Sequence, residues 1–108
     1  MEFALLIHGP ERAWAELPEQ DRAALFAAYL DFGRQLRESG VTVLFGARLA
    51  RPDAAKGEPR EDGRPELGGM WILDLPSEEA ALEWAGRLPA GPGDRVELRR
   101  CDRGRMSR

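Results

Sequence analysis

The chain has one cysteine, one histidine, one lysine and no asparagine in its 108 residues. A single cysteine, Cys101, excludes an internal disulfide and any metal site built from several cysteines. It also fits a reducing compartment, so we expect a cytoplasmic protein. With His8 as the only histidine, no complete metal-binding or catalytic constellation appears in the sequence, and we predict neither a metal nor a cofactor.

The sequence also lacks a dominant charge and a long apolar run. Its 16 basic and 19 acidic residues give a net charge of -3, so nothing attracts it overall to nucleic acid or to an anionic membrane. The opening apolar run, Phe3–His8, is too short to cross a membrane, follows Glu2 and has no basic leader. We therefore expect no nucleic-acid and no membrane partner, and a protein that handles a small molecule.

Apolar periodicity predicts six elements in the order βαββαβ. Phe3–His8, which stops at Gly9-Pro10, has the pattern of a strand covered on both faces. A helix is expected after Pro18, ending near Gly40, and Ser77 is a candidate N-cap for a second helix. The other predicted strands are Val41–Leu49, Gly68–Leu75 and Arg95–Cys101, the last an edge strand in which Val96 and Leu98 alternate with Glu97 and Arg99.

Two βαβ units in series predict one domain over residues 1–108 with an α+β, ferredoxin-like fold. In that fold both helices cover one face of a four-stranded antiparallel sheet. The first strand nevertheless has apolar residues on both sides, with Phe3, Leu5 and Ile7 on one and Ala4 and Leu6 on the other. We expect a second copy of the chain to cover the helix-free face, giving a homodimer.

Each predicted helix has an apolar stripe that should face the sheet. Tyr29, the only tyrosine, lies on the first stripe, where we expect it to be buried with its hydroxyl hydrogen-bonded. The stripes are Leu25, Tyr29, Phe32 and Leu36 in the first helix, and Leu82, Ala85 and Leu88 in the second.

Two segments have no apolar period. Ala50–Leu67 is rich in proline, glycine and charge, so we predict a long hairpin loop that is mobile between Ala50 and Glu66. The last residues, about 100–108, contain several arginines and resemble a flexible, solvated terminus.

Several stretches resemble the YCII-related family, and especially its DGPF-domain branch. They are "LLIHG" near the start, "LRESGV" at the end of the first helix, "LGGMWILDLPS", and "EEAALEWAGRLP" leading into "VELRR". The resemblance covers almost the whole chain. It implies a dimeric α/β barrel with the strands in the order four, one, three, two, and it implies little about activity.

The sequence departs from that family in two places. The branch motif resembles "DGPFAETKE", whereas this chain has "EDGRPELGG", with only Asp62 and Gly63 in register. Other members have a histidine and an aspartate as a candidate catalytic pair. Tyr29 and Leu88 stand at those positions here, so this pair is absent.

The strand order that the resemblance implies brings His8 close to the starts of the third and fourth strands. A histidine oriented by a carboxylate is a reasonable proton-transfer unit near neutral pH. We predict that Glu66 or Asp94 is the carboxylate that His8 reaches most easily, while Asp62 and Glu11 are also nearby. The alternative is a strand-end histidine that only hydrogen-bonds the backbone.

Ligand contacts are expected from arginine and tryptophan. Arg48 or Arg95 can hold an anionic group, and Trp71 can line an aromatic pocket, although tryptophans in a small domain are more often core or interface residues. Two functions remain open. One is a binding protein for a small organic acid or aromatic ligand, and the other is a cofactor-free lyase or isomerase with His8 as acid/base.

Overall fold

A computed structural model describes residues 1–49 and 65–102 of the chain. The predicted loop Ala50–Leu67, with Asp62 and Gly63, lies almost entirely outside the described residues, as does the tail from residue 103. Within the described part the elements are β1 (Glu2–Gly9), α1 (Glu11–Glu16), α2 (Glu19–Glu38), β2 (Thr42–Arg48), β3 (Glu66–Asp74), α3 (Glu78–Arg87) and β4 (Arg95–Arg100).

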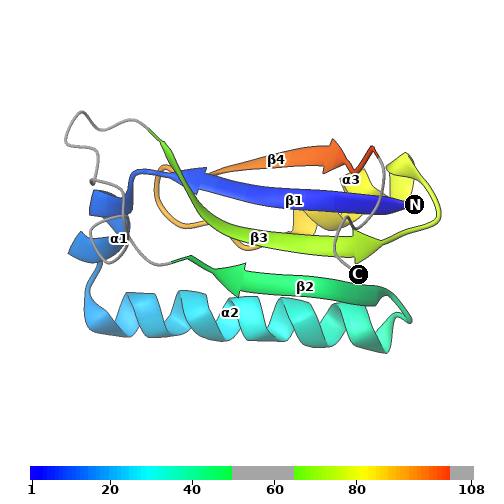
Figure 1. Cartoon of the computed structure of the whole chain (residues 1–108). Coiled ribbons are helices and arrows are strands. Elements are labelled where there is room, and N and C mark those ends of the chain that lie inside the picture. The colour runs from blue at the N-terminus through cyan, green and yellow to red at the C-terminus, as the bar shows by residue number, and fades with distance from the viewer. Residues whose placement is uncertain (50–64, 103–108) are drawn as a thin grey trace.

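The four strands form one antiparallel sheet in the order β2-β3-β1-β4, as the resemblance implied. β1 lies in the interior of the sheet, while α2 runs along the edge strand β2 (Figure 1). His8 is paired with Leu67 on β3 and with Arg95 on β4, whereas Asp74 pairs with Glu2 at the other end of β1. The predicted meeting of strand ends around His8 is therefore confirmed.

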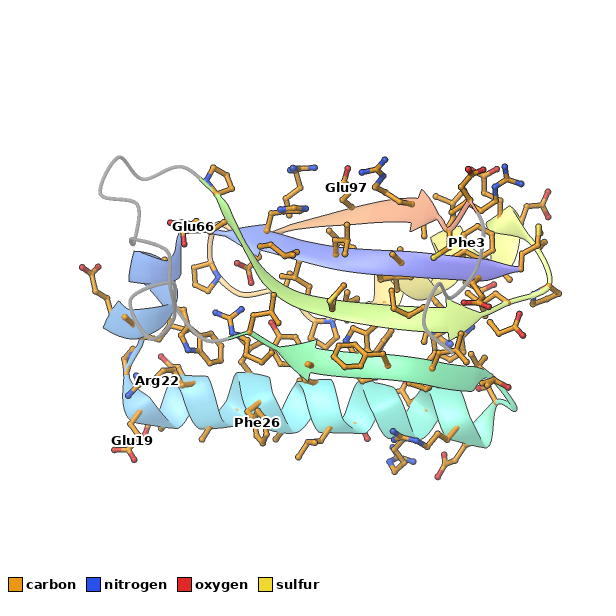
Figure 2. All side chains as sticks on the ribbon, viewed as in Figure 1. Phe3, Glu19, Arg22, Phe26, Glu66 and Glu97 are labelled. Carbon is orange, nitrogen blue, oxygen red and sulfur yellow. The ribbon has the colours of Figure 1, made fainter. Side chains whose placement is uncertain are left out.

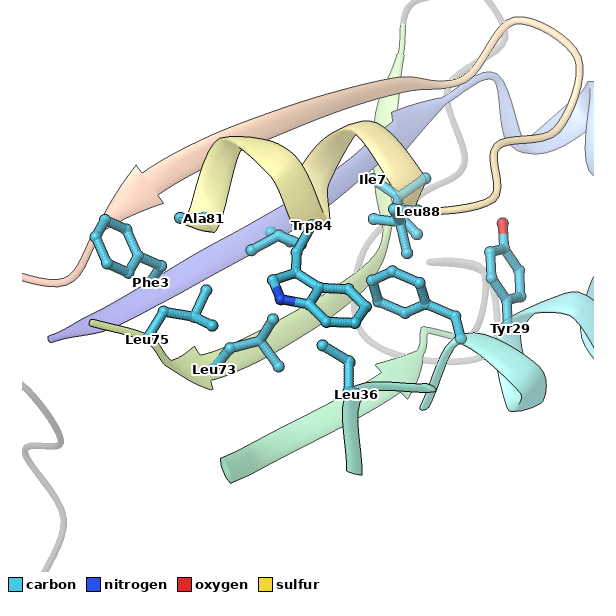
Figure 3. Close-up of a cluster of buried hydrophobic side chains, with 11 residues drawn as sticks. Phe3, Ile7, Tyr29, Leu36, Leu73, Leu75, Ala81, Trp84 and Leu88 are labelled. Carbon is cyan, nitrogen blue, oxygen red and sulfur yellow. The ribbon is translucent and has the colours of Figure 1, made fainter. Parts of the chain in front are cut away.

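Side chains alternate along β1 and separate the two faces of the sheet. Phe3, Leu5 and Ile7 are buried, and the residues between them are partly exposed. Because the buried set packs with residues of both α2 and α3, the two helices cover the same face (Figure 3). This confirms the ferredoxin-like α+β fold. The buried core consists of Phe3, Leu5, Ile7, Tyr29, Phe32, Leu36, Leu73, Leu75, Ala81, Trp84 and Leu88.

Two details of the helices differ from the prediction. α1 was not expected, because six residues are too few to show a helical period. The inner stripe of α3 is Ala81 and Trp84, continued by the C-cap residue Leu88, while Leu82 is 58 % exposed. Both stripes have helical spacing, and packing of the large Trp84 ring against Phe32 selects the observed one. The predicted N-cap is confirmed, because Ser77 Oγ accepts a hydrogen bond from the Ala80 amide at 3.1 Å.

The helix-free face has an apolar centre. Ile72 on β3 lies between Ala4 of β1 and Phe45 of β2, and Phe45 is 49 % exposed. Beside them Leu6 pairs with Met70 on one side and with Glu97 of the edge strand on the other.

None of the helices in the described ranges is long and apolar enough to span a membrane.

Candidate functional site

A cavity of about 250 Å³ opens on the helix-covered face, between α2 and the strands β1, β3 and β2. Most of its lining is apolar, which favours an organic ligand over a hydrated ion. The residues around it are Ile7, Phe26, Tyr29, Leu30, Gly46, Ala47, Arg48, Gly69 and Trp71.

The floor of this cavity is a row of cross-strand neighbours with a gap in the middle. Ile7 pairs with Gly69, and Gly69 pairs with Arg48, so the three residues share one face. Gly69 places no side chain in the row. Next to it, Gly46 pairs with Trp71, and a Cβ at position 46 would lie 2.8 Å from Trp71 Cε3. Glycine at position 46 therefore lets the indole ring lie flat against β2 and form one wall.

The opposite wall is one face of α2. Phe26, Tyr29 and Leu30 are three and four residues apart, so they project from the same side of the helix. Phe26 is 52 % exposed and Leu30 is 61 % exposed, so these two form the mouth of the cavity. Figure 2 shows Phe26 on α2, well separated from Glu97 on β4.

Tyr29 lines this cavity and also contains a buried polar atom. The residue is 8 % exposed, and among the residues that the structure describes its hydroxyl has no hydrogen-bond partner. The predicted burial is confirmed, but the predicted hydrogen bond to the hydroxyl is wrong. Burial raises the pKa of Tyr29, the nearby Asp94 carboxylate raises it further, and Arg48 lowers it. The phenol consequently stays protonated at neutral pH and is a hydrogen-bond donor.

Arg48 brings positive charge to the cavity. Its guanidinium lies 4.4 Å from the centre of the Trp14 ring, in a cation–π contact between β2 and α1. Asp94 is held nearby, because its Oδ2 accepts a hydrogen bond from the Gly91 amide at 2.8 Å. Its Oδ1 occupies the place of a side chain at Gly9, where a Cβ would lie 1.8 Å away.

His8 belongs to the other face of the sheet. Its Nε2 lies 2.9 Å from Glu97 Oε1, and the His8 side chain is 21 % exposed. Glu97 is a diagonal cross-strand neighbour, because it pairs with Leu6, two residues before His8 on β1. His8 thus has an orienting carboxylate and remains accessible to solvent.

The residues predicted as one site therefore separate into two groups. Arg48 and Trp71 line the cavity, and Asp94 lies close enough to act on Tyr29. His8 and Arg95 pair with each other on the helix-free face. The carboxylate that contacts the His8 ring is that of Glu97. Asp94 instead accepts a hydrogen bond from the Gly91 amide, and Glu66 is the cross-strand partner of Gly9. The alternating pattern of the edge strand predicted Glu97 only as a solvent-facing residue, so its contact with His8 was not predicted.

Metal binding has no support in the described ranges. No group of three or more histidine, cysteine, aspartate or glutamate side chains is close enough there to hold an ion.

Comparison with known families agrees with this architecture. The model of the YCII-related domain matches residues 1–101, which include all four strands and all three helices of the described structure. The chain belongs to the YCII-related domain family. A search of curated proteins finds no match to this chain.

Proposed function

We propose that this YCII-related protein binds a small aromatic or organic acid in the cavity beneath α2. The observation that carries the proposal is an apolar cavity that is lined by one arginine and by the rings of Tyr29 and Trp71. Ligand sites of proteins commonly combine apolar walls with a few polar groups in this way.

The size of the cavity limits the ligand. A volume of about 250 Å³ is below the roughly 300–1,000 Å³ that is typical of sites for drug-sized molecules. Trp71 and Phe26 offer flat aromatic surfaces to a ring, and Arg48 offers positive charge. A monocarboxylate with one ring or a short branched chain matches these walls.

Arg48→Ala is expected to weaken benzoate binding about tenfold or more, because hydrogen bonds to a charged group contribute roughly 1.5–3 kcal/mol. Neutral benzamide should lose much less. A thermal-shift screen of aromatic and aliphatic monocarboxylates finds binders, and calorimetry then gives the affinities. Arg87→Ala is the matched control, because Arg87 stacks on Trp84 at 4.5 Å but does not line the cavity. Equal benzoate affinity in the Arg48→Ala variant and the wild type would contradict the role of Arg48.

We also propose that the protein is a cytoplasmic homodimer of the DGPF branch. The motifs around "LGGMWILDLPS" support the branch, and the single cysteine supports the location. The dimer is supported by the apolar centre of the helix-free face, where Ile72, Phe45 and Leu6 lie close together. A second copy placed face to face would cover these side chains. Because an isologous contact uses the same patch on both subunits, it would bury these side chains in both copies.

A second candidate function is a lyase or isomerase that uses His8 as acid/base. The contact between His8 Nε2 and Glu97 Oε1 favours it, because a carboxylate orients the imidazole while the ring stays accessible. His8 would act inside the space between the two sheets of the dimer. This site is separate from the cavity beneath α2, so one experiment distinguishes the two functions.

His8→Ala is expected to lower turnover by about 10²–10⁴-fold, the usual contribution of a general acid or base. NMR of each acid that the screen identifies shows whether it is converted during incubation with the protein. Glu97→Gln, which keeps the size of the side chain but removes its charge, should give a smaller loss. Conversion at the wild-type rate by His8→Ala would eliminate this candidate.

A further inference from the structure

Two glycines form a narrow slot for the ring of Trp71. Gly46 lies on β2, and Gly33 is a buried position in the middle of α2, which runs along β2 (Figure 1). A Cβ at position 46 would lie 2.8 Å from Trp71 Cε3 and 2.9 Å from Cζ3, and a Cβ at position 33 would lie 3.1 Å from Cη2. All three distances are shorter than a normal contact between carbon atoms. The six-membered part of the indole therefore fits between the strand and the helix because both positions lack a side chain.

Both glycines are unfavourable for the elements that contain them. Glycine inside a helix or strand loses more backbone entropy on folding than alanine does, and it offers no side chain for packing. Neither Gly33 nor Gly46 has a positive φ, so the backbone would accept alanine at both positions. The close approach of the Trp71 ring is thus the feature that requires glycine there.

The slot keeps the indole out of an apolar cavity that the ring could fill. Trp71 and Gly46 both line this cavity. On the core side the indole meets Phe32 edge to face at 5.3 Å between ring centres, and Phe32 is 2 % exposed, so the core has no room for a displaced ring. The cavity is the open space that remains. Because an empty apolar cavity is destabilising, packing alone would favour a side chain inside it.

We infer that Gly46 and Gly33 determine the size of the ligand that the cavity accepts, because they hold the Trp71 ring at its wall. This inference rests on the proposed function. It narrows the ligand class from small acids in general to acids with one aromatic ring, since a ring in contact with the indole gains stabilisation beyond the apolar area that it buries. The slot leaves about 250 Å³ for that ring.

Gly46→Ala is expected to weaken benzoate binding about tenfold or more, which is about 1.4 kcal/mol or more, because the displaced indole overfills the cavity. Gly33→Ala should give a smaller loss, about threefold, since a smaller shift of the ring relieves the contact at 3.1 Å. Isobutyrate has no ring and needs less room, so its affinity should fall about twofold or less in both variants. NMR titration of the full chain measures weak and strong binding alike.

Gly86→Ala is the matched control. Gly86 is an exposed glycine in α3, and a Cβ there would meet no atom within 4 Å. This variant should bind benzoate and isobutyrate as the wild type does. A loss of benzoate affinity in Gly86→Ala as large as that in Gly46→Ala would overturn the inference, because the effect would then not depend on the slot.

A double-mutant cycle tests whether the loss acts through the indole. In a Trp71→Leu background position 71 has no ring to displace, so Gly46→Ala should change benzoate affinity about twofold or less. An equal loss in both backgrounds would mean that the new methyl group acts directly in the cavity or on the fold, and it would overturn the inference.

Melting curves show whether each variant is folded. If Gly46→Ala does not fold, Gly33→Ala supplies the result, and unchanged benzoate affinity in that variant overturns the inference. A wild type that binds isobutyrate but not benzoate, or a folded Gly46→Ala variant that binds benzoate as well as the wild type does, would overturn the inference alone. If the wild type binds neither acid, the proposed function fails as well.

Discussion

Phe32→Ala is expected to lower the free energy of unfolding by about 3–5 kcal/mol, the usual loss when a buried phenylalanine is truncated. Phe32 is 2 % exposed and meets two tryptophans edge to face, Trp71 at 5.3 Å and Trp84 at 5.8 Å between ring centres. It therefore joins α2 to β3 and to α3 at once. Removal of the ring leaves a cavity that none of these elements can close without moving.

Urea unfolding at one fixed protein concentration measures this loss, since association would make the apparent stability depend on concentration. Phe26→Ala is the matched control, because Phe26 lies on the same helix but is 52 % exposed. It should cost much less, near the range of surface substitutions. A loss below about 1 kcal/mol for Phe32→Ala would mean that the two helices do not share one core.

Ile72→Asp is expected to convert the proposed dimer to monomers at micromolar concentration. Ile72 lies between Ala4 and Phe45 on the helix-free face. An isologous interface would bury the new carboxylate of both copies, and each buried charge without a partner costs several kcal/mol. Since 1.4 kcal/mol is a factor of ten, association should weaken by at least about a hundredfold.

Sedimentation velocity distinguishes the two states. Leu82→Asp is the control, because Leu82 is 58 % exposed on α3 and the helices cover the other face of the sheet. It should leave the wild-type state unchanged. A monomeric wild type at micromolar concentration would refute the dimer, and a dimeric Ile72→Asp variant would place the interface elsewhere.

Local patterns were enough to predict the fold. Strand and helix periods, the cap at Ser77 and the glycine and proline breaks act over a few residues, so they can be recognised without knowing which segments pack together. The two faces of β1 followed from strict alternation. Where two apolar stripes of one helix have similar strength, local patterns cannot decide which stripe faces the core. In α3 the stripes that contain Leu82 and Ala81 both have helical spacing, and only the contact of Trp84 with Phe32 decides between them.

The candidate site shows the same division. The sequence by itself determined the order of the four strands and the two longer helices, the strand end at His8, and the interest of Arg48, Trp71 and Tyr29, because each of these depends on residue type and local spacing. Only the tertiary structure decided that Glu97 meets His8 and that the cavity lies on the opposite face. A diagonal cross-strand contact depends on register. The cavity depends on the missing side chains at Gly69 and Gly46 and on where neighbouring strands place them, so neither feature has a local signal.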